Sequence, residues 1–392
     1  MSDDVLKRAI DNLKRRNNQA DTFAINRAVV TIKIFGIGGG GGNVLKRLAE
    51  GGLTDTELVA VNTDVSALNG LNVADIKTVQ IGDRITKGKG TGGDIALGEQ
   101  AAREDSEKIR MLMSGADMIF ITTTMGGGTG TGAAPIVAKI AKEQGILTVG
   151  VVTVPFKFEG IRKLKRANEG VVKMQSYMDA LVVIKNDNLM KLPENKSLSI
   201  VDAFHSADDV LRQAIKCIAE LVLTIGFINV DFADVTTIFQ QSESSDALLG
   251  IGRSNISAVK AVQQAIESPL IDRSLQGARG MILNITGDES LSLYDVNEAA
   301  DFIYSQTAAD VNIIFGAVVD KTMNGVVQAT IIATDFIDSL ALKSPTVTVP
   351  KSTVTVSKGF NFDAPAFPEQ KSDEKGASVI AAFDFLKNRR KK

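Results

Sequence analysis

Three short segments of the sequence are rich in glycine, and each lies close to the end of a strand-like apolar run: residues 36–42, 88–93 and 126–132. Glycine lets the backbone approach a ligand closely. Where such a segment leads into a helix, the first amide groups of that helix are unpaired and lie at the positive end of its dipole, so they bind phosphate. The sequence therefore predicts a phosphate-binding site built from separate parts of the chain.

The first segment satisfies the pattern G-x-G-x-x-G through Gly36, Gly38 and Gly41, which suits a nicotinamide dinucleotide as well as a mononucleotide. The segment at 126–132 reads GGGTGTG, again before a helical pattern, and adds two hydroxyl groups to the amides. Two such segments on different strands of one sheet can enclose a polyphosphate from two sides, whereas a dinucleotide-binding fold normally uses one. The chain contains no G-x-x-x-x-G-K-[ST] motif, which excludes a P-loop NTPase.

Alternating strand and helix patterns position these segments. The predicted strands are near-continuous apolar runs: Ala28–Ile37, Glu57–Asn62, Thr78–Ile81, Met118–Thr122, Leu147–Val154 and Ala180–Ile184. Helical patterns between them cover Asn43–Glu50, Ile95–Ser114 and Ala133–Gln144. This alternation is typical of an α/β fold whose parallel sheet is covered on both faces, and such sheets bind ligands at the carboxyl ends of their strands.

A long helix follows this region. Ser199–Ile225 is apolar around most of its circumference, so we expect it to be buried between two domains. Beyond it, two helical patterns (Ile256–Glu267, Tyr294–Ser305) and three strand patterns (Gly280–Ile285, Val311–Val319, Val326–Thr334) indicate a smaller α+β domain. The predicted organisation is a charged N-terminal extension (1–27), a nucleotide-binding domain (28–198), the central helix (199–226), the α+β domain (227–338), a disordered linker (339–376) and a C-terminal docking tail (377–392).

Composition narrows the class of protein. The 392 residues carry a formal net charge of −2, so no basic field would attract nucleic acid. No apolar run approaches the roughly 18 residues of a membrane span, and the first residues lack the apolar core of a signal peptide, so we expect a cytoplasmic protein. Cys217 is the only cysteine and His205 the only histidine, which leaves no basis for a histidine metal site or catalytic triad. We expect His205 to be a bystander.

Several motifs together resemble the FtsZ family of tubulin-like GTPases. GGGTGTG is similar to the tubulin signature in its bacterial form, and three further motifs agree in order and approximate spacing: VNTD at 61–64, TVPF with FEG at 153–160, and NVDFAD at 229–234. The similarity runs from about Thr31 to about Asp338. It implies a Rossmann-like parallel-sheet GTPase domain, a long central helix and a smaller α+β C-terminal domain.

The resemblance implies a binding site for GTP or GDP. Glu159 would contact the ribose, and Phe204 would pack against guanine. Asp209 and Asn186 would read the edge of the base; a carboxylate accepts from the paired N1–H and N2–H₂ donors of guanine, which adenine lacks. The expected nucleotide-binding residues are Gly39, Gly40, Gly41, Gly42, Asn43, Gly92, Gly93, Gly127, Gly128, Thr129, Gly130, Thr131, Glu159, Lys163, Asn186, Phe204 and Asp209. The sequence departs from the family at Lys163, where arginine is usual, and at His205, where glycine is usual.

The resemblance also implies that Asp231, Asp234 and Asn229 position and polarise the water that attacks the γ-phosphate. Asp209 lies in the first half of the long helix and these residues lie beyond its far end, roughly 25–30 Å away at about 1.5 Å per residue. They would therefore act on the nucleotide of a neighbouring chain, and such a head-to-tail contact builds an open filament. Mg²⁺ is expected to be held mainly by phosphates and water, with no metal site made of side chains.

The expected partners and location follow from the same resemblance. The chain would polymerise with itself as the scaffold of the cell-division ring, in the cytoplasm beneath the membrane. The tail (377–392) combines apolar residues on one helix face with basic residues, so it would dock on membrane-adaptor or division proteins or touch the membrane surface, unless it is a solvated end. Two other functions stay open: a nicotinamide-dependent oxidoreductase built on Gly36–Gly41 and Asp64, and a filament relative that binds GTP without hydrolysing it.

Overall fold

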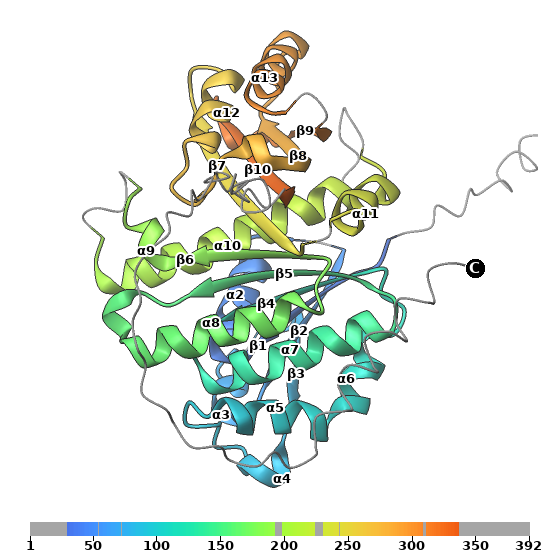
Figure 1. Cartoon of the computed structure of the whole chain (residues 1–392), viewed down its shortest axis with the longest axis vertical. Coiled ribbons are helices and arrows are strands. Elements are labelled where there is room, and N and C mark those ends of the chain that lie inside the picture. Colours follow the sequence, from blue (N-terminus) through green and yellow to red (C-terminus); the bar gives the residue numbers. More distant parts are fainter. Residues whose placement is uncertain are drawn as a thin grey trace, which may run out of the picture. The chain divides into compact units, whose positions relative to one another are not determined.

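The computed structural model describes residues 30–53, 55–71, 73–192, 198–223, 230–242, 244–308 and 311–336. Within these residues, ten strands form one continuous sheet in the order β3-β2-β1-β4-β5-β6-β7-β10-β8-β9 (Figure 1). Neighbouring strands from β3 to β7 are parallel, β10 is antiparallel to β7 and β8, and β9 is parallel to β8. The predicted α/β fold with a smaller α+β part is confirmed.

The parallel half of the sheet contains β1 (Ile32–Ile37), β2 (Thr56–Asn62), β3 (Ile76–Gln80), β4 (Met118–Thr124), β5 (Leu147–Val154) and β6 (Ala180–Lys185). Its helices are α2 (Gly38–Glu50), α3 (Val65–Asn69), α4 (Asp83–Thr86), α5 (Ile95–Glu104), α6 (Ser106–Met113), α7 (Gly128–Glu143), α8 (Ile161–Gln175) and α9 (Asn186–Leu189), with a 3-10 turn η1 (Lys157–Glu159). The strand order from β3 to β6 is that of Rossmann folds, which bind ligands where the order reverses, here between β1 and β4.

The second half begins with α10 (Ile200–Leu223) and continues through α11 (Phe232–Gln240), β7 (Asp246–Ser254), α12 (Ala258–Ile266), η3 (Leu275–Gly277), β8 (Ala278–Gly287), α13 (Leu293–Gln306), β9 (Asn312–Val319), η4 (Lys321–Met323) and β10 (Val327–Phe336). The sequence patterns did not predict β7, because two glycines interrupt its apolar run. A Cβ on Gly250 would lie 2.3 Å from the carbonyl oxygen of Ala265, and one on Gly252 would lie 2.1 Å from that of Ala261. These glycines let α12 pack directly on β7.

The parallel sheet is buried on both faces, as its apolar strands predicted. Ile32 and Ile34 of β1 belong to a buried cluster that includes α2 and α10. Phe35 and Ile37 point to the opposite face of the sheet and belong to a second buried cluster with α5, α6, α7 and α8. Successive side chains of a strand point to opposite faces, so helices on both faces hold β1 in place.

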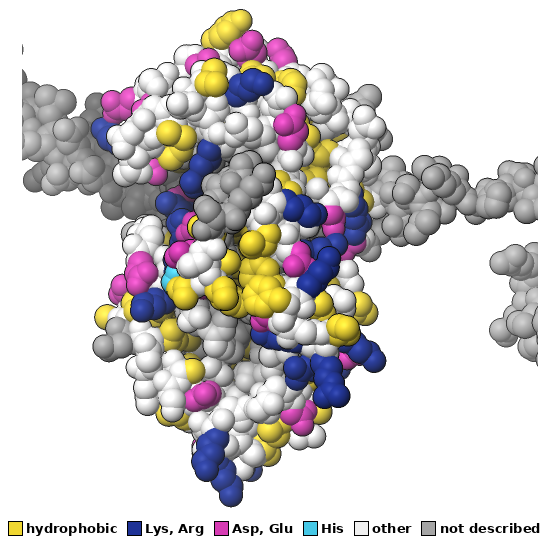
Figure 2. Space-filling model, turned by 90° about the vertical axis from the view of Figure 1, so that its left-hand side faces the viewer, with side chains coloured by type: hydrophobic (Ala, Val, Ile, Leu, Met, Phe, Trp, Pro, Cys, Tyr) yellow, Lys and Arg dark blue, Asp and Glu magenta, His cyan; other side chains and the backbone are white. Residues whose placement is uncertain are grey.

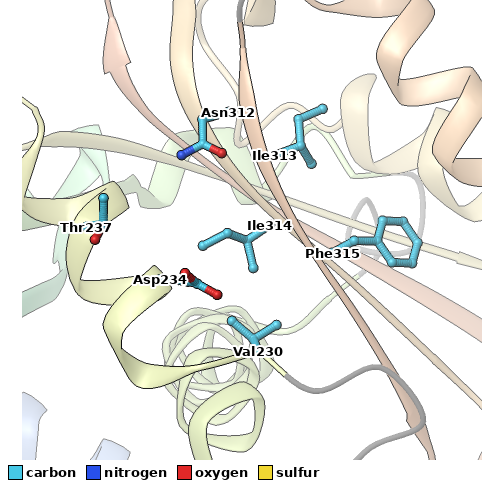
Figure 3. A pocket seen from close by; sticks show the side chains of 7 residues that line it. All are labelled: Val230, Asp234, Thr237, Asn312, Ile313, Ile314 and Phe315. Carbon is cyan, nitrogen blue, oxygen red and sulfur yellow. The ribbon is translucent and has the colours of Figure 1, made fainter.

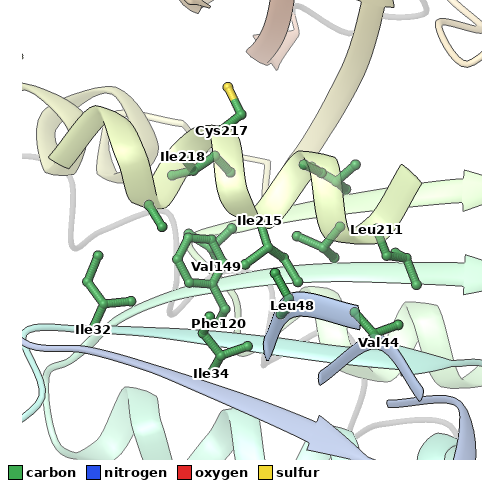
Figure 4. Close-up of a cluster of buried hydrophobic side chains, with 14 of the residues drawn as sticks. Ile32, Ile34, Val44, Leu48, Phe120, Val149, Leu211, Ile215, Cys217 and Ile218 are labelled. Atoms are coloured by element: carbon green, nitrogen blue, oxygen red, sulfur yellow. The ribbon is translucent and has the colours of Figure 1, made fainter. Parts of the chain in front are cut away.

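Helix α10 is buried between the two halves, which confirms the expected position of the long helix. Leu211, Ile215 and Ile218 pack on the parallel sheet and α2 (Figure 4). On another side of the helix, the Sγ of Cys217 lies 3.8 Å from the Nδ2 of Asn284 on β8. The helix therefore connects both halves through side chains on different faces.

The helices that follow β1 and β4 begin earlier than predicted. α2 starts at Gly38 rather than near Asn43, and α7 starts at Gly128 rather than at Ala133. Glycine has a low helix propensity, which concealed these first turns in the sequence. The glycines that were expected to bind phosphate therefore form the first turns of helices, and not loops that precede them.

One predicted helix is two helices. Ile95–Ser114 is interrupted at Asp105, between α5 and α6. The Oδ2 of Asp105 accepts a hydrogen bond from the amide of Gly82 at 2.7 Å. This contact bridges 23 positions of sequence, so no local pattern could have indicated the break.

Several predicted segments lie outside the described residues: the extension 1–27, the linker 339–376, the tail 377–392 and Asn229. The ends of the central helix and of the α+β domain at 226, 227 and 338 also lie outside them. In the described part of the chain, no helix combines the length and the hydropathy that crossing a membrane would require.

Candidate functional site

The N-termini of α2 and α7 meet where the strand order reverses. β1 leads directly into α2 at Gly38, and β4 is followed by α7 at Gly128. A Cβ on Gly38 would lie 3.0 Å from the amide nitrogen of Gly130, so the two first turns abut. Both sets of unpaired amides, and the positive ends of both helix dipoles, therefore converge on one place.

Two glycines in these turns are not required by the fold. Nothing lies within 4 Å of a Cβ placed on Gly39 or on Gly127, and neither residue has a positive φ. Among the described glycines, these are the only two for which both statements hold. One is at the start of α2 and the other caps α7. Glycine here leaves open space beside two helix N-termini, as a bound phosphate group would need.

The other predicted glycines of these turns pack against protein atoms. A Cβ on Gly40 would lie 2.3 Å from the Oγ1 of Thr124, and one on Gly41 would lie 2.5 Å from the carbonyl carbon of Gly36. Gly42 faces Leu71 at 3.3 Å. These positions bring α2 close to the sheet, so their role is to place Gly39 and the amides.

In α7, as in α2, the glycines other than the one with open space pack against protein atoms. A Cβ on Gly128 would lie 2.1 Å from the Oγ1 of Thr91, and one on Gly130 would lie 2.3 Å from the Oγ1 of Thr123. The two hydroxyls of the segment are also engaged: Thr129 Oγ1 lies 2.7 Å from Thr63 Oγ1, and Thr131 Oγ1 accepts from the amide of Gly126 at 2.7 Å. Each hydroxyl thus has a protein partner, while the backbone amides at the start of α7 remain for a ligand.

The third glycine segment contacts the segment at 126–132 through Thr91, whose Oγ1 lies 3.5 Å from that of Thr129. Gly92 has a φ of +58° and open space around its Cβ position. Gly93 has no open space beside it, because Arg166 of α8 donates a short hydrogen bond to its carbonyl oxygen. Asp94 caps α5 by accepting from the amide of Ala96 at 2.8 Å, so its carboxylate is used within the loop.

Glu159 and Lys163 lie beside the second glycine segment. Glu159 accepts from the amide of Phe156 at 2.9 Å and forms a short ion pair with Lys163. A Cβ on Gly126 would lie 2.7 Å from the Cγ of Lys163, so the stem of this lysine covers the glycine turn. The Lys163 ammonium is thereby held beside the start of α7.

An aromatic cluster lies next to Glu159, which accepts from the amide of one of its members, Phe156. Phe204 of α10 is 37% exposed and meets Phe156 edge to face, with ring centroids 5.5 Å apart. Phe158 stacks on Phe156 at 5.1 Å. Asn186, at the start of α9, is 1% exposed, and its Oδ1 has no hydrogen-bond partner. A buried, unpaired acceptor of this kind is expected where a ligand supplies the missing donor.

The structure places Asp209 away from Phe204. Its Oδ1 accepts from Arg212 at 2.8 Å and its Oδ2 from Gln213 at 2.9 Å. It lines a cavity of about 890 Å³ formed with β7 and α12. Burial would raise the pKa of the Asp209 carboxyl, but the hydrogen bonds and charge of Arg212 outweigh it and hold the pKa below its usual range.

Asp208 is the carboxylate that shares a face with Phe204. It lies four residues further along α10, and residues at this spacing are neighbours on a helix surface. Its side chain is 15% exposed, and its Oδ2 lies 3.7 Å from the Nε of Arg47 on α2. Burial raises the pKa of Asp208 to about 6, because Arg47 offsets only part of the desolvation. Asp209 was the expected residue at the base; the i, i+4 spacing from Phe204 makes Asp208 a second candidate.

The acids of the NVDFAD motif lie at the other end of α10. Asp231 is the N-cap of α11, where its Oδ1 accepts from the amide of Ala233 at 3.4 Å, and Asp234 is in the first turn of that helix. Asp234 borders a cavity of about 330 Å³ with Thr237 and, from the edge strand β9, Asn312 (Figure 3). Asn312 was not predicted, because it comes from a separate part of the sequence.

Asp64, on which the oxidoreductase alternative depended, has a local role. Its Oδ1 accepts from the amides of Ser66 at 2.9 Å and Ala67 at 3.3 Å, so the carboxylate caps α3. Across the described residues, no group of three or more His, Cys, Asp or Glu side chains is arranged to hold a metal ion.

Comparisons with known proteins agree with this geometry. Residues 31–194 match the GTPase domain of the Tubulin/FtsZ family, and residues 245–337 match the C-terminal domain of the FtsZ family. An empty FtsZ dimer from M. jannaschii is 37% identical, with a TM-score of 0.75 over 82% of this chain and 92% of that one. A GTPγS-bound protofilament of CetZ2 from Haloferax volcanii shares the fold at 20% identity, with a TM-score of 0.66 over 79% of this chain and 94% of that one.

The two family matches and the identity to the M. jannaschii protein cover both halves of the sheet, including the glycine turns at the ends of β1 and β4. The chain is therefore a member of the FtsZ family of tubulin-like GTPases.

Proposed function

We propose that this protein binds GTP and hydrolyses it to GDP and phosphate as it assembles head to tail into filaments. The observation that carries the proposal is the open space at Gly39 and Gly127, beside two converging helix N-termini. Support also comes from two similar structures, the FtsZ dimer from M. jannaschii and the CetZ2 protofilament with bound GTPγS.

In this proposal the amides at the starts of α2 and α7 hold the phosphates, with Gly92 and Lys163 beside them. Glu159 would contact the ribose, and Asn43, on the exposed side of α2, would help to hold the phosphates. Mg²⁺ would be held mainly by phosphate oxygens and water, and it would offset the charge that develops on the transferred group.

We assign the reading of guanine to Asp208 rather than to Asp209. Phe204 and Asp208 lie on one face of α10, and the unpaired Oδ1 of Asn186 can accept a further donor. A carboxylate in this position accepts from N1–H and N2–H₂ of guanine. Asp209 is less suited, because Arg212 and Gln213 already occupy both of its oxygens.

The matched variants Asp208→Asn and Asp209→Asn test this assignment. An asparagine at 208 offers one acceptor and one donor, which suits the N1–H and O2 of xanthine but not the N2–H₂ of guanine. We expect D208N to lose about 100-fold in affinity for GDP and to gain affinity for xanthosine diphosphate, since a site with unpaired polar groups discriminates strongly. D209N should change both affinities by less than about threefold. Titration calorimetry with the two nucleotides measures these changes, and the reverse ranking of the two variants would refute the assignment.

Distance supports a hydrolytic site shared between two chains. From Asp208 to Leu223, α10 rises about 22 Å, and Asp231 and Asp234 follow beyond that end. These acids are therefore candidates to act on a neighbouring molecule's nucleotide, together with Asn229 of the same motif. They would orient the water whose oxygen attacks the γ-phosphorus in line with the departing bridging oxygen of GDP.

The surfaces at the two ends are suited to meet. Figure 2 shows hydrophobic side chains gathered on one face. Phe158 of the aromatic cluster is 68% exposed, and Ile161 and Val201, close to cluster members in the sequence, are 84% and 62% exposed. The opposite end of α10 carries the cavity between α11 and β9, with apolar Ile314 and Phe315 in its lining. A contact between two different surfaces repeats without closing, which gives a filament.

We further propose that such filaments serve as the scaffold of the cell-division ring, in the cytoplasm at the division site. The tail 377–392, outside the described residues, would connect them to membrane-adaptor or division proteins. Membership of the FtsZ family supports this role.

The concentration dependence of GTP hydrolysis tests the proposal. Because the acids would come from a neighbour, phosphate release per molecule should be near zero at low protein concentration. It should rise steeply above the concentration at which GTP, but not GDP, makes the protein sediment. Phosphate release and pelleting are measured on the same samples. Turnover per molecule that does not depend on concentration would refute the shared site, and binding without release would favour the non-hydrolysing alternative.

A further inference from the structure

Helix α8 packs along the start of α7 through one of its faces. A Cβ on Gly126 would lie 2.7 Å from the Cγ of Lys163, and one on Gly170 would lie 2.4 Å from the Cγ2 of Thr131. Arg166 comes three residues after Lys163 and four before Gly170, so it lies on the same face of the helix, between these two contacts. The backbone of Arg166 therefore runs beside the first turn of α7.

The side chain of Arg166 reaches the glycine segment 88–93. Its Nη1 donates a short hydrogen bond to the carbonyl oxygen of Gly93. This segment lies against α7: a Cβ on Gly128 would lie 2.1 Å from the Oγ1 of Thr91 and 2.8 Å from the amide nitrogen of Asp94, which follows the segment. The hydrogen bond thus connects α8 to the segment 88–93 at the place where that segment meets the start of α7.

Arg166 differs from Lys163 in how its charge is balanced. The ammonium of Lys163 forms a short ion pair with Glu159. In the part of the chain that the structure describes, no carboxylate forms an ion pair with Arg166, and the buried Nε of this arginine has no hydrogen-bond partner. A partly buried cation without a counterion is costly unless an anion completes its surroundings. The guanidinium therefore keeps its full charge for an anionic ligand.

We infer that Arg166 is a positioning residue of the phosphate site, which holds the glycine segment 88–93 against α7 through Gly93 and favours a bound triphosphate through its unpaired positive charge. The inference rests on the proposed binding of GTP at the starts of α2 and α7. Gly92, the neighbour of Gly93, has open space around its Cβ position, and the contact made by Arg166 would keep this open position beside α7. A neutral donor could hold the carbonyl of Gly93 equally well, so the charge of Arg166 calls for a second role.

The expected consequence is a preference for the nucleotide that carries more phosphate charge. Attraction grows with the charge of the ligand, and water and salt screen it less at a partly buried arginine than at an exposed one. Loss of the charge at position 166 should therefore weaken the binding of GTPγS more than the binding of GDP. Loss of a packing contact alone would weaken the binding of both nucleotides equally.

The variants Arg166→Gln and Arg166→Lys separate the charge from the hydrogen bond. Glutamine keeps an amide donor without the charge, and lysine keeps both the charge and a donor. With the full chain below the concentration at which it assembles, we expect R166Q to lose about 20-fold in affinity for GTPγS and about threefold for GDP, as for one hydrogen bond to a charged group. R166K should stay within about threefold for both nucleotides. As a matched control, Lys165→Gln removes a charge from an exposed neighbouring position and should change both affinities by less than about twofold. Titration calorimetry measures all four proteins.

Hydrogen exchange without nucleotide tests the hold on the segment 88–93 separately. Arg166→Met keeps an apolar stem and has no donor, so the amides of residues 90–94 should exchange at least about fivefold faster in R166M. In R166Q and R166K they should stay within about twofold of the unchanged protein. Thermal unfolding of each variant controls for loss of the fold.

Three results would overturn the inference: equal losses for GTPγS and GDP in R166Q, equal losses in R166Q and R166K, or unchanged exchange of the segment in R166M. Failure of the unchanged protein to bind GTPγS would instead refute the proposed function, whatever the exchange of the segment 88–93 shows.

Discussion

Asp231→Asn is expected to bind GTP as tightly as the unchanged protein and to hydrolyse it at least about 100-fold more slowly, a typical loss for one group that stabilises a transition state. Asparagine is as good an N-cap as aspartate, so α11 should keep its first turn while the carboxylate is lost. GTP affinity and phosphate release are measured above the assembly concentration. As a control, Ser257→Ala removes the cap of α12 in the same half of the molecule and should leave turnover nearly unchanged.

A mixture of two inactive variants tests whether the hydrolytic site is shared between two chains. D231N retains the nucleotide site and Gly39→Ala retains the acids. In an equal mixture, the acids of the G39A chain can meet the nucleotide of the D231N chain. Phosphate release by the mixture should therefore exceed the sum of the two separate variants. Full activity of D231N alone would contradict the role given to Asp231.

Gly39→Ala and Gly127→Ala are expected to weaken nucleotide binding by roughly 10–100-fold, with little loss of stability. A methyl group at either position meets no protein atom within 4 Å, and neither residue has a positive φ. In α2, alanine should even favour the helix by about 0.5–1 kcal/mol. The added methyl group would occupy the space proposed for a phosphate, and overpacking of about 1–3 kcal/mol corresponds to roughly 10–100-fold in affinity.

Gly41→Ala and Gly128→Ala are the matched controls. Their Cβ atoms would lie 2.5 Å from the carbonyl carbon of Gly36 and 2.1 Å from the Oγ1 of Thr91, so these variants should unfold at lower temperature. Differential scanning fluorimetry with and without GDP distinguishes the two classes. G39A should show an unchanged melting temperature, and G127A a slightly lowered one because alanine is a poorer N-cap than glycine. Both should gain much less stability from GDP than the unchanged protein does. A variant of this pair that gains as much stability from GDP as the unchanged protein would contradict the assignment of the phosphate site.

The sequence was sufficient for the parts of the fold that local pattern determines. Strands buried on both faces appear as unbroken apolar runs, and the glycine segments at the ends of β1 and β4 indicated the site before any contact was known. The predicted starts of α2 and α7 were wrong. Packing of Gly40 against Thr124 and of Gly128 against Thr91, and not helix propensity, holds these glycines in helical turns. The break at Asp105 depends on a hydrogen bond to Gly82, which sequence patterns do not reveal.

For the candidate site, too, sequence patterns predict only part of the arrangement. Which of two adjacent aspartates faces Phe204 depends on the rotation of α10, and the partners of the second one, Arg212 and Gln213, lie on its own helix. Periodicity from Phe204 indicates that Asp208, and not Asp209, shares its helix face. The proximity of Asn312 to Asp234 could not be predicted, because it requires the pairing of β9 at the sheet edge.

The burial of Cys217 between α10 and β8 makes the chain suitable for spectroscopic labelling. Cys217 is 4% exposed, and burial raises the pKa of its thiol to about 12, so the thiolate that reacts with maleimides is essentially absent at neutral pH. Because the sequence has no other cysteine, one cysteine introduced on the surface would be the sole site for a dye. Donor- and acceptor-labelled molecules could then report filament growth and subunit exchange by energy transfer, with every native residue of the interior left in place.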